Sequence, residues 1–269
     1  MIRPLIVTAL LVCTSAIAQE TKAPGLPPSA ETAKKALEDS PRHGEFQFLA
    51  LPGSEVKMKT WVSFPERPEK APVVLVIHEI FGLSEWITGV ADALAKEGFI
   101  AIAPDLIAGM EGAAENPREA IGKLSEEEAL ARLNIALEHG LALPAASGKS
   151  ASVGFCWGGK TSFLYAASQP KLNAAVVYYG TSPDAVTLAK VAVPVLGLYG
   201  ENDARVNATI PAAEEEMKKL GKPFDVVIHE KAGHGFLRQQ DGQEGANLKA
   251  TEKAWTRTIE FLKQHTEAK

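Results

Sequence analysis

The fold of this chain is decided by one stretch, SASVGFCWGGKTSFLYAA at residues 150–167. Its first four residues are typical of a short buried strand, and residues 160–167 are typical of a helix. Between them Cys156 stands in GFCWGG, with glycines on both sides. A nucleophile on a sharp turn needs such glycines, because neighbouring segments must approach without Cβ atoms. The helix N-terminus would favour the thiolate. The stretch therefore predicts a cysteine nucleophile, and the alternative is a buried core cysteine.

The segments around this stretch alternate between strand and helix patterns. The run VVLVI at residues 73–77 is typical of a parallel strand buried on both faces. Trp86, Val90 and Leu94 recur with helical spacing. This alternation predicts a mostly parallel, doubly wound α/β sheet, which binds ligands at the carboxyl ends of its strands. Further strands are expected at 99–103, 151–155, 174–178, 193–198 and 224–229, and further helices near 126–139, 158–168, 211–220 and 246–265.

Residues 1–18 have the pattern of a signal peptide. Arg3 supplies a positive start, residues 5–12 form an apolar core too short to span a bilayer, and AIA at residues 16–18 is a cleavage motif. We therefore expect cleavage after Ala18 and a periplasmic or secreted protein. No membrane attachment is expected once the leader is removed.

Residues 19–43 are expected to be an N-terminal extension and linker. Three prolines and a glycine in residues 21–29 suggest a flexible tether, and residues 31–39 suggest a short helix. A single domain is expected from residue 44 to residue 269. It should begin with an antiparallel hairpin, because apolar and polar residues alternate in its second strand.

Composition limits the classes of function. The formal net charge of −5 becomes −6 when Arg3 leaves with the leader, and no basic run stands out, so nucleic-acid binding is not expected. Cys156 is the only cysteine left after cleavage, which excludes an intrachain disulfide and marks a reactive thiol. We expect a monomer that acts on a small molecule.

A cysteine nucleophile requires a histidine base and an acid that orients it. After a strand–nucleophile–helix turn of this kind, the acid comes next in sequence and the histidine last. Asp203 follows the strand at 193–198 and His234 follows the strand at 224–229, so both should lie at the sheet edge that carries Cys156. Rival groups are three acids and two histidines: Asp105, Glu201, Asp184, His78 and His229.

Several short motifs together resemble one known family. They are GFCWGG at 154–159, IHEIFG at 77–82, APDL at 103–106, YYG at 178–180 and HGF at 234–236. This combination resembles the dienelactone hydrolase family of the α/β-hydrolase superfamily, over residues 44–262. The resemblance implies an α/β-hydrolase fold, to which this chain is expected to add the N-terminal antiparallel hairpin. The family hydrolyses carboxymethylenebutenolide lactones in catechol pathways and is typically cytoplasmic, whereas this chain carries a leader. The resemblance therefore implies the family's fold and hydrolytic chemistry, but not that substrate.

The resemblance implies further roles. Glu79 matches the carboxylate that contacts the resting thiol and takes its proton when substrate binds. The backbone N–H groups of Ile80 and Trp157 match the oxyanion hole. Arg238 matches an arginine that holds the substrate carboxylate, for which a guanidinium fork is well suited.

Phe81 and Tyr178 are also expected to bind substrate. A second substrate-binding arginine of the family lies in a region where this chain is rearranged. Arg118 is the only arginine near that region, and its alignment stays open.

These observations predict a cysteine-dependent hydrolase of small activated esters or lactones that forms an acyl-enzyme on Cys156. One alternative is a broader exported carboxylesterase or thioesterase, and another is a non-catalytic binding protein. His78 and Glu79 begin an H-E-x-x-H metal motif, but Gly82 stands in place of the second histidine. No zinc-type cluster is present in the sequence, so we expect neither a metal nor a cofactor.

Overall fold

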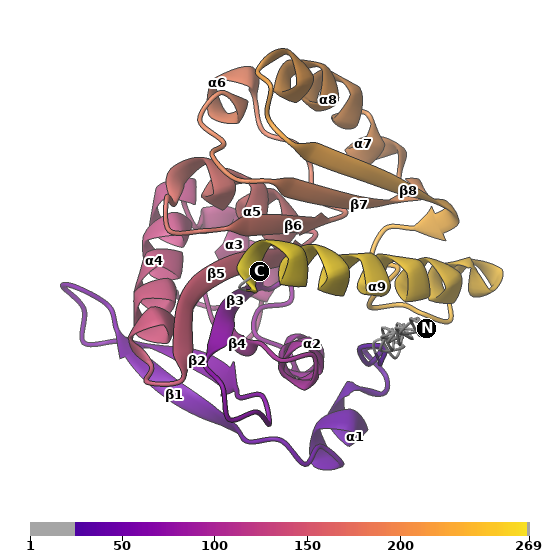
Figure 1. The fold of residues 1–269 in the computed structure, drawn as a ribbon. Helices are drawn as coiled ribbons and strands as arrows, with labels where there is room; N and C mark the ends of the chain where they lie inside the picture. The colour runs from indigo at the N-terminus through magenta and orange to yellow at the C-terminus, as the bar shows by residue number, and fades with distance from the viewer. Residues whose placement is uncertain (1–24, 268–269) are drawn as a thin grey trace, which may run out of the picture.

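The computed structural model describes residues 25–267 (Figure 1). The predicted signal peptide, its cleavage site and residues 19–24 lie outside the described residues. One eight-stranded sheet has the order β1-β2-β4-β3-β5-β6-β7-β8. Its strands are β1 (Gly44–Ala50), β2 (Lys57–Ser63), β3 (Ala71–Ile77), β4 (Ile100–Pro104), β5 (Ala146–Phe155), β6 (Ala174–Tyr178), β7 (Val195–Asn202) and β8 (Phe224–Gly233).

The sheet is parallel from β4 to β8 and antiparallel at its other edge. β1 pairs antiparallel with β2, and β2 pairs antiparallel with β4, which confirms the predicted hairpin. The chain leaves β3 for β4 on one side and later returns to β5 on the other side of β3. The strand order therefore reverses beside β3. Ligands in such folds bind at this point, outside the carboxyl ends of the strands.

Helices cover both faces of the sheet (Figure 1). One face carries α2 (Glu85–Lys96) and α9 (Ala246–Thr266), and the other carries α4 (Glu126–Ala142), α5 (Trp157–Ser168) and α8 (Ile210–Lys219). The shorter helices are α1 (Ala33–Glu38), α3 (Pro117–Lys123), α6 (Ala185–Leu188), α7 (Ala204–Asn207) and the 3-10 turn η1 (Gln243–Gly245).

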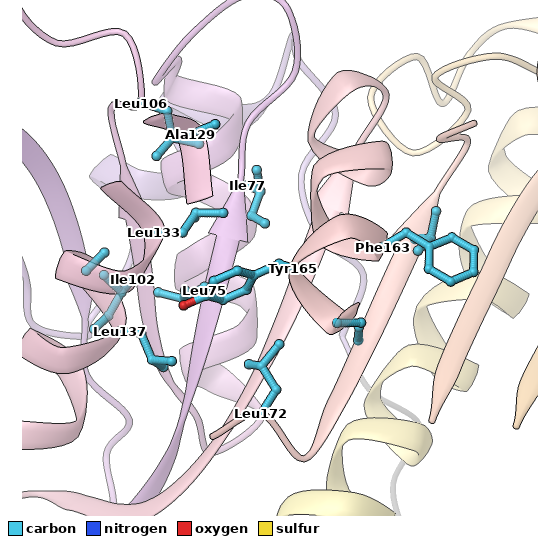
Figure 2. Close-up of a cluster of buried hydrophobic side chains, with 14 of the residues drawn as sticks. Leu75, Ile77, Ile102, Leu106, Ala129, Leu133, Leu137, Phe163, Tyr165 and Leu172 are labelled. Atoms are coloured by element: carbon cyan, nitrogen blue, oxygen red, sulfur yellow. The ribbon is translucent and has the colours of Figure 1, made fainter. Parts of the chain in front are cut away.

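The core explains why β3 is apolar throughout. Every residue of β3 is buried, and its side chains alternate between the two faces of the sheet. Leu75 and Ile77 belong to the cluster shown in Figure 2, where Leu133 and Leu137 of α4 face them. The intervening valines of β3 pack against α2 and α9 on the opposite face. A strand covered on both faces needs a continuous apolar run rather than an alternating one.

Residues 25–29 differ from the flexible tether expected for residues 21–29. The backbone N–H of Gly25 donates to Glu97 (3.3 Å), and the carbonyl of Pro28 accepts from the indole of Trp86 (3.0 Å). Both partners lie in or beside α2. A proline-rich composition indicates few backbone donors, but it carries no information about such distant partners. Within the described residues, the extension is therefore packed against the domain.

Candidate active site

Cys156 lies at the sharp turn between β5 and α5. Its φ of 55° is in the left-handed region, which is strained for a residue with a side chain. A Cβ on Gly154 would lie 1.9 Å from the carbonyl oxygen of Gly158, and a Cβ on Gly158 would lie 2.3 Å from that of Ile77. Glycine is required at both positions for the turn to fit against β3. The predicted sharp turn between a strand and a helix is present, with Cys156 at its apex.

Asp203 and His234 meet at the carboxyl ends of β7 and β8. His234 Nδ1 is 2.5 Å from Asp203 Oδ2. Asp203 is buried and caps α7, since its other oxygen accepts from the backbone N–H of Val206 at 3.4 Å. The carboxylate of Asp203 accepts this hydrogen bond from Nδ1–H of His234, which leaves Nε2 on the far side of the ring as the nitrogen available to a substrate. About a third of the His234 side chain (35%) is exposed, which leaves it accessible to a substrate.

None of the rival acids is hydrogen-bonded to His234 in the described residues. Asp184 caps α6, Glu201 accepts from the backbone N–H of Lys231 (2.8 Å), and Asp105 accepts from its own loop. His229 lies within β8, as expected, with its ring against Phe236 at 5.3 Å. The geometry therefore favours Asp203 and His234.

Glu79 is a buried carboxyl at the end of β3, only 4% exposed. Burial raises its pKa to about 7, although the guanidinium of Arg238 opposes this rise from 3.5 Å. The Tyr179 hydroxyl lies near enough to lower the pKa of Glu79 as well. Even so, Oε2 of Glu79 and the buried Tyr179 hydroxyl make no hydrogen bond of regular geometry. At neutral pH this carboxyl can therefore either accept or donate a proton.

The Cys156 thiol is protonated at rest. Burial raises its pKa to about 11, and the negative charge of Glu79 adds to this effect. The backbone N–H of Trp157 and the cation of Arg205 act in the opposite direction, but they do not prevail. The helix N-terminus alone was expected to favour the thiolate. The free energy needed to remove the thiolate charge from water is larger than the stabilisation that the helix dipole provides.

His78 is fully buried and holds the loop that follows β3. Its Nδ1 lies 2.7 Å from the carbonyl oxygen of Glu79, and its Nε2 accepts from the backbone N–H of Leu106 at 3.1 Å. Burial lowers the pKa of His78, so the ring is neutral with its proton on Nδ1. The ring also stacks on Trp157, with centroids 5.5 Å apart.

The contact between His78 and Glu79 fixes one peptide group. The carbonyl of Glu79 and the N–H of Ile80 belong to the same planar, trans unit, so they point in opposite directions. Within residues 25–267 the Ile80 N–H donates no hydrogen bond. Ile80 and Trp157 were the predicted oxyanion-hole donors; Ile80 lies in the loop after β3, and Trp157 is the first residue of α5, directly after the turn that follows β5.

The structure separates the predicted binding residues. Phe81 is half exposed (49%), and the guanidinium of Arg238 lies 4.5 Å from its ring centroid, so both are at the site. Tyr178 is not, because its side chain is fully buried and its hydroxyl contacts Thr258 of α9 at 2.6 Å. The neighbouring Tyr179 is equally buried, but it lies beside the site, with a φ of 39° and its ring 5.1 Å from that of His234.

Arginines other than Arg238 occupy different positions. Arg118 lies exposed in the first turn of α3 and forms no ion pair with the described residues. Arg205 was not predicted. It is exposed on α7, and its charge lowers the pKa of the Cys156 thiol, so it faces the same region. The sequence feature that could have identified Arg205 is its position two residues after the predicted acid, Asp203, at the end of a strand.

A cavity of about 390 Å³ adjoins the loop that carries Phe81. Its lining comes from this loop and from the segment between β4 and α3, and it exposes both polar and apolar groups. The residues include Phe81, Leu83, Ile107, Met110 and Pro117, with Asp105 as the charged member. The cavity offers space for part of a ligand beside the candidate site.

Comparison with known proteins decides the family. Residues 58–266 match the profile of the Dienelactone hydrolase family. The chain belongs to the dienelactone hydrolase family. This confirms the resemblance seen in the sequence and makes the protein a carboxylic ester hydrolase. A Yersinia pestis relative that bears the provisional name carboxymethylenebutenolidase is 30% identical over 233 residues, which cover 80% of this chain and 86% of the relative.

Solved structures of dienelactone hydrolases have the same fold. A Klebsiella pneumoniae protein provisionally assigned as a dienelactone hydrolase superimposes with a TM-score of 0.74 and 26% identity, covering 84% of this chain and all of that one. The acylaminoacyl peptidase of Pyrococcus horikoshii has a TM-score of 0.70 at 15% identity, covering 88% of this chain and 44% of its own. The expected α/β-hydrolase fold is therefore confirmed for this family member.

In residues 25–267, no group of three or more histidine, cysteine, aspartate or glutamate side chains is arranged to hold a metal ion. None of the helices in this part of the chain is both long enough and apolar enough to cross a membrane.

Proposed function

We propose that this family member hydrolyses small activated esters or lactones through an acyl-enzyme on Cys156. The observation that carries the proposal is the Asp203–His234 contact of 2.5 Å. It lies at the same sheet edge as a cysteine held at a φ of 55° between β5 and α5. A strained nucleophile, an oriented histidine and a buried acid are the groups that acyl transfer requires.

The acylation step begins from a neutral thiol. Glu79, with a pKa of about 7, takes the thiol proton when a substrate excludes water from the site. The sulfur attacks the carbonyl carbon, and the negative charge that develops on oxygen is stabilised by the N–H groups of Ile80 and Trp157. The C–O bond then breaks, and the leaving oxygen receives the proton held by Glu79. A thioester on Cys156 remains.

Deacylation uses His234. Nε2 of His234 takes a proton from water, and the resulting hydroxide attacks the thioester carbonyl. The C–S bond breaks, and the imidazolium returns the proton to sulfur, which restores the thiol. Asp203 keeps Nδ1 protonated and stabilises the imidazolium while it exists. Enol esters and aryl esters suit this route, because their leaving oxygens need little help.

The substrate is expected to carry a carboxylate. Arg238 offers a guanidinium that is about a quarter exposed (27%), beside Glu79 and over the face of Phe81. Arg205 supplies a second exposed cation from α7. The cavity of about 390 Å³ beside Phe81 supports a second candidate, a broader carboxylesterase or thioesterase for larger esters. Family membership argues against the third alternative, a non-catalytic binding protein.

The test compares three forms of the purified protein with mono-4-nitrophenyl succinate, an anionic ester, and 4-nitrophenyl butyrate, a neutral one. Cys156→Ala should lose hydrolysis of both, and Cys156→Ser should keep at most a trace, because a hydroxyl ionises far less readily than a thiol. Mass spectrometry of a rapidly quenched wild-type reaction should show the acyl group on Cys156. Full activity in Cys156→Ala would refute the proposal. A preference of the wild-type protein for the neutral ester would favour the broader esterase.

The proposal extends to the compartment. An exported monomer is proposed from the leader pattern in residues 1–18, the cleavage motif before Gln19 and the single remaining thiol. N-terminal sequencing of protein from the periplasmic fraction or the medium should then begin at Gln19. A chain that retains Met1 in the cytoplasmic fraction would contradict export without affecting the proposed chemistry.

A further inference from the structure

Residues 25–42 form a segment that we call the N-terminal strap. The strap lies outside residues 58–266, the part of the chain that matches the family profile. It nevertheless packs closely on α2, which belongs to that part. Ala33 is completely buried there. Gly89 of α2 makes room for the strap, since a Cβ at this position would lie 2.8 Å from Pro28 Cγ. In Figure 1 the strap runs from α1 towards the loop that follows β8.

One end of the strap is fixed to α2 by a partly buried ion pair. Arg42 contacts both carboxylate oxygens of Asp92, through Nε at 2.9 Å and Nη2 at 2.6 Å. Ser40 donates to the same carboxylate at 2.8 Å. Both charged side chains are only 12% exposed. A guanidinium that binds a carboxylate through two nitrogens at low exposure is a strong and directional contact.

The other end of the strap is fixed to the loop that carries Arg238. The backbone N–H of Ala30 donates to the carbonyl of Arg238 itself, at 2.9 Å. The side chain of Gln240 donates to the carbonyl of Pro27 at 3.0 Å. Since Pro28 also accepts from Trp86 of α2, the strap connects α2 directly to the loop after β8.

Arg238 therefore has its main chain and its side chain held by different parts of the molecule. The strap holds its carbonyl, and its own turn holds its N–H, which donates to Gly235 at 3.0 Å. The guanidinium extends from this backbone to Glu79 and the Phe81 ring. A long side chain reaches a defined point only if its backbone is fixed, because each free rotor spreads the charged end over a larger volume.

We propose that the N-terminal strap positions Arg238 over Glu79 and thereby sets the enzyme's preference for substrates that carry a carboxylate. The inference rests on the proposed function, in which Arg238 binds that carboxylate. Among the described residues the strap makes no hydrogen bond or ion pair to Cys156 or His234, so it acts through Arg238.

The test removes one hydrogen bond from the strap. Ala30→Pro deletes the N–H that binds the Arg238 carbonyl, and Ala30→Gly is the matched control that keeps it. The measured quantity is the ratio of kcat/KM for mono-4-nitrophenyl succinate to that for 4-nitrophenyl butyrate. We expect Ala30→Pro to lower this ratio about three- to tenfold, the worth of one hydrogen bond, and Ala30→Gly to leave it unchanged. In an Arg238→Ala background, Ala30→Pro should have no further effect on the ratio.

Gln240→Ala provides a second, milder variant in case the proline prevents folding. It removes the amide bound to Pro27 and should lower the ratio in the same direction. A second readout is the pH at which activity on the neutral ester rises. It should move upwards in Ala30→Pro, because a displaced guanidinium no longer favours the Glu79 carboxylate.

The results separate the inference from the proposed function. If Arg238→Ala lowers the ratio while Ala30→Pro and Gln240→Ala leave it unchanged, the strap inference is wrong and the role of Arg238 stands. If Arg238→Ala itself leaves the ratio unchanged, the proposed carboxylate site fails, and the strap inference fails with it.

Discussion

Replacing Arg238 by glutamine should shift the pH dependence of the reaction. In the proposed mechanism Glu79 must be ionised to take the thiol proton, so kcat/KM for a neutral ester should rise with pH through the pKa of Glu79, which is about 7. Arg238 lies 3.5 Å from Glu79 and lowers that pKa. Loss of the cation must therefore raise the pKa and move the rise in activity to higher pH.

The distance sets the size of the shift. Two unit charges 3.5 Å apart interact by roughly 5 kcal/mol at an effective dielectric constant of about 20. Solvent reaches part of the Arg238 side chain, and water can replace it in the variant, so only a fraction of this energy is lost. Carboxyls beside an arginine show pKa values lower by about one to three units. We expect the smaller value, a shift of about one unit, equivalent to about 1.4 kcal/mol.

The assay is kcat/KM for 4-nitrophenyl butyrate between pH 5 and pH 9. Arg238→Gln should lose about tenfold near pH 6 and little near pH 9, as follows from a one-unit shift. Arg238→Lys is the matched control, because it keeps the charge and should leave the rise near its original pH. Glu79→Gln should remove the rise together with most of the activity. An unmoved rise in Arg238→Gln, or one that persists in Glu79→Gln, would refute the assignment.

Three further outcomes are expected. His78→Leu should lower kcat about ten- to a hundredfold with little change in KM, because the Ile80 peptide group is then no longer held by the His78 ring. His78→Asn can still donate a hydrogen bond to the Glu79 carbonyl and should recover most of the rate. Equal kcat values in the two variants would contradict this role. Arg205→Ala should raise KM for mono-4-nitrophenyl succinate several-fold more than for the neutral butyrate, and equal changes would place Arg205 outside the substrate site. Without substrate, iodoacetamide should modify Cys156 slowly at pH 7, because a thiol pKa of about 11 leaves roughly one molecule in ten thousand ionised. Mass spectrometry would follow the alkylation, and a rapid reaction would show that the thiol is already activated in the free enzyme.

The sequence was sufficient for the elements that local patterns determine. The strand predicted at 174–178 coincides with β6, and the predicted helix start at residue 246 coincides with that of α9. Asp203 and His234 could be selected because each follows an apolar strand, and parallel strands bring their carboxyl ends to one edge. The glycines around Cys156 identified the turn for a steric reason that the structure reproduces.

The sequence was insufficient where the direction of a side chain depends on a shift of one residue, or where the state of a group depends on a residue far away in the chain. Tyr178 was chosen over Tyr179, but the chain leaves β6 at this point, and a positive φ turns Tyr179 towards the site. The protonation of Cys156 depends on burial and on Glu79, which lies 77 positions earlier in the chain. The short helices α6 and α7 carry too few residues to show a period.

The strap also affects the order in which this protein can finish folding. Pro27 and Gln240 are 213 positions apart. The contact between them therefore joins the beginning of the described chain to the loop that follows β8, the last strand. Contacts of such long sequence separation form late, because the loop they close is costly in entropy. A chain that emerges from its N-terminus, from a ribosome or through a membrane pore, presents the strap first and its docking loop last. Selectivity for charged substrates would then mature only after the whole polypeptide has been delivered.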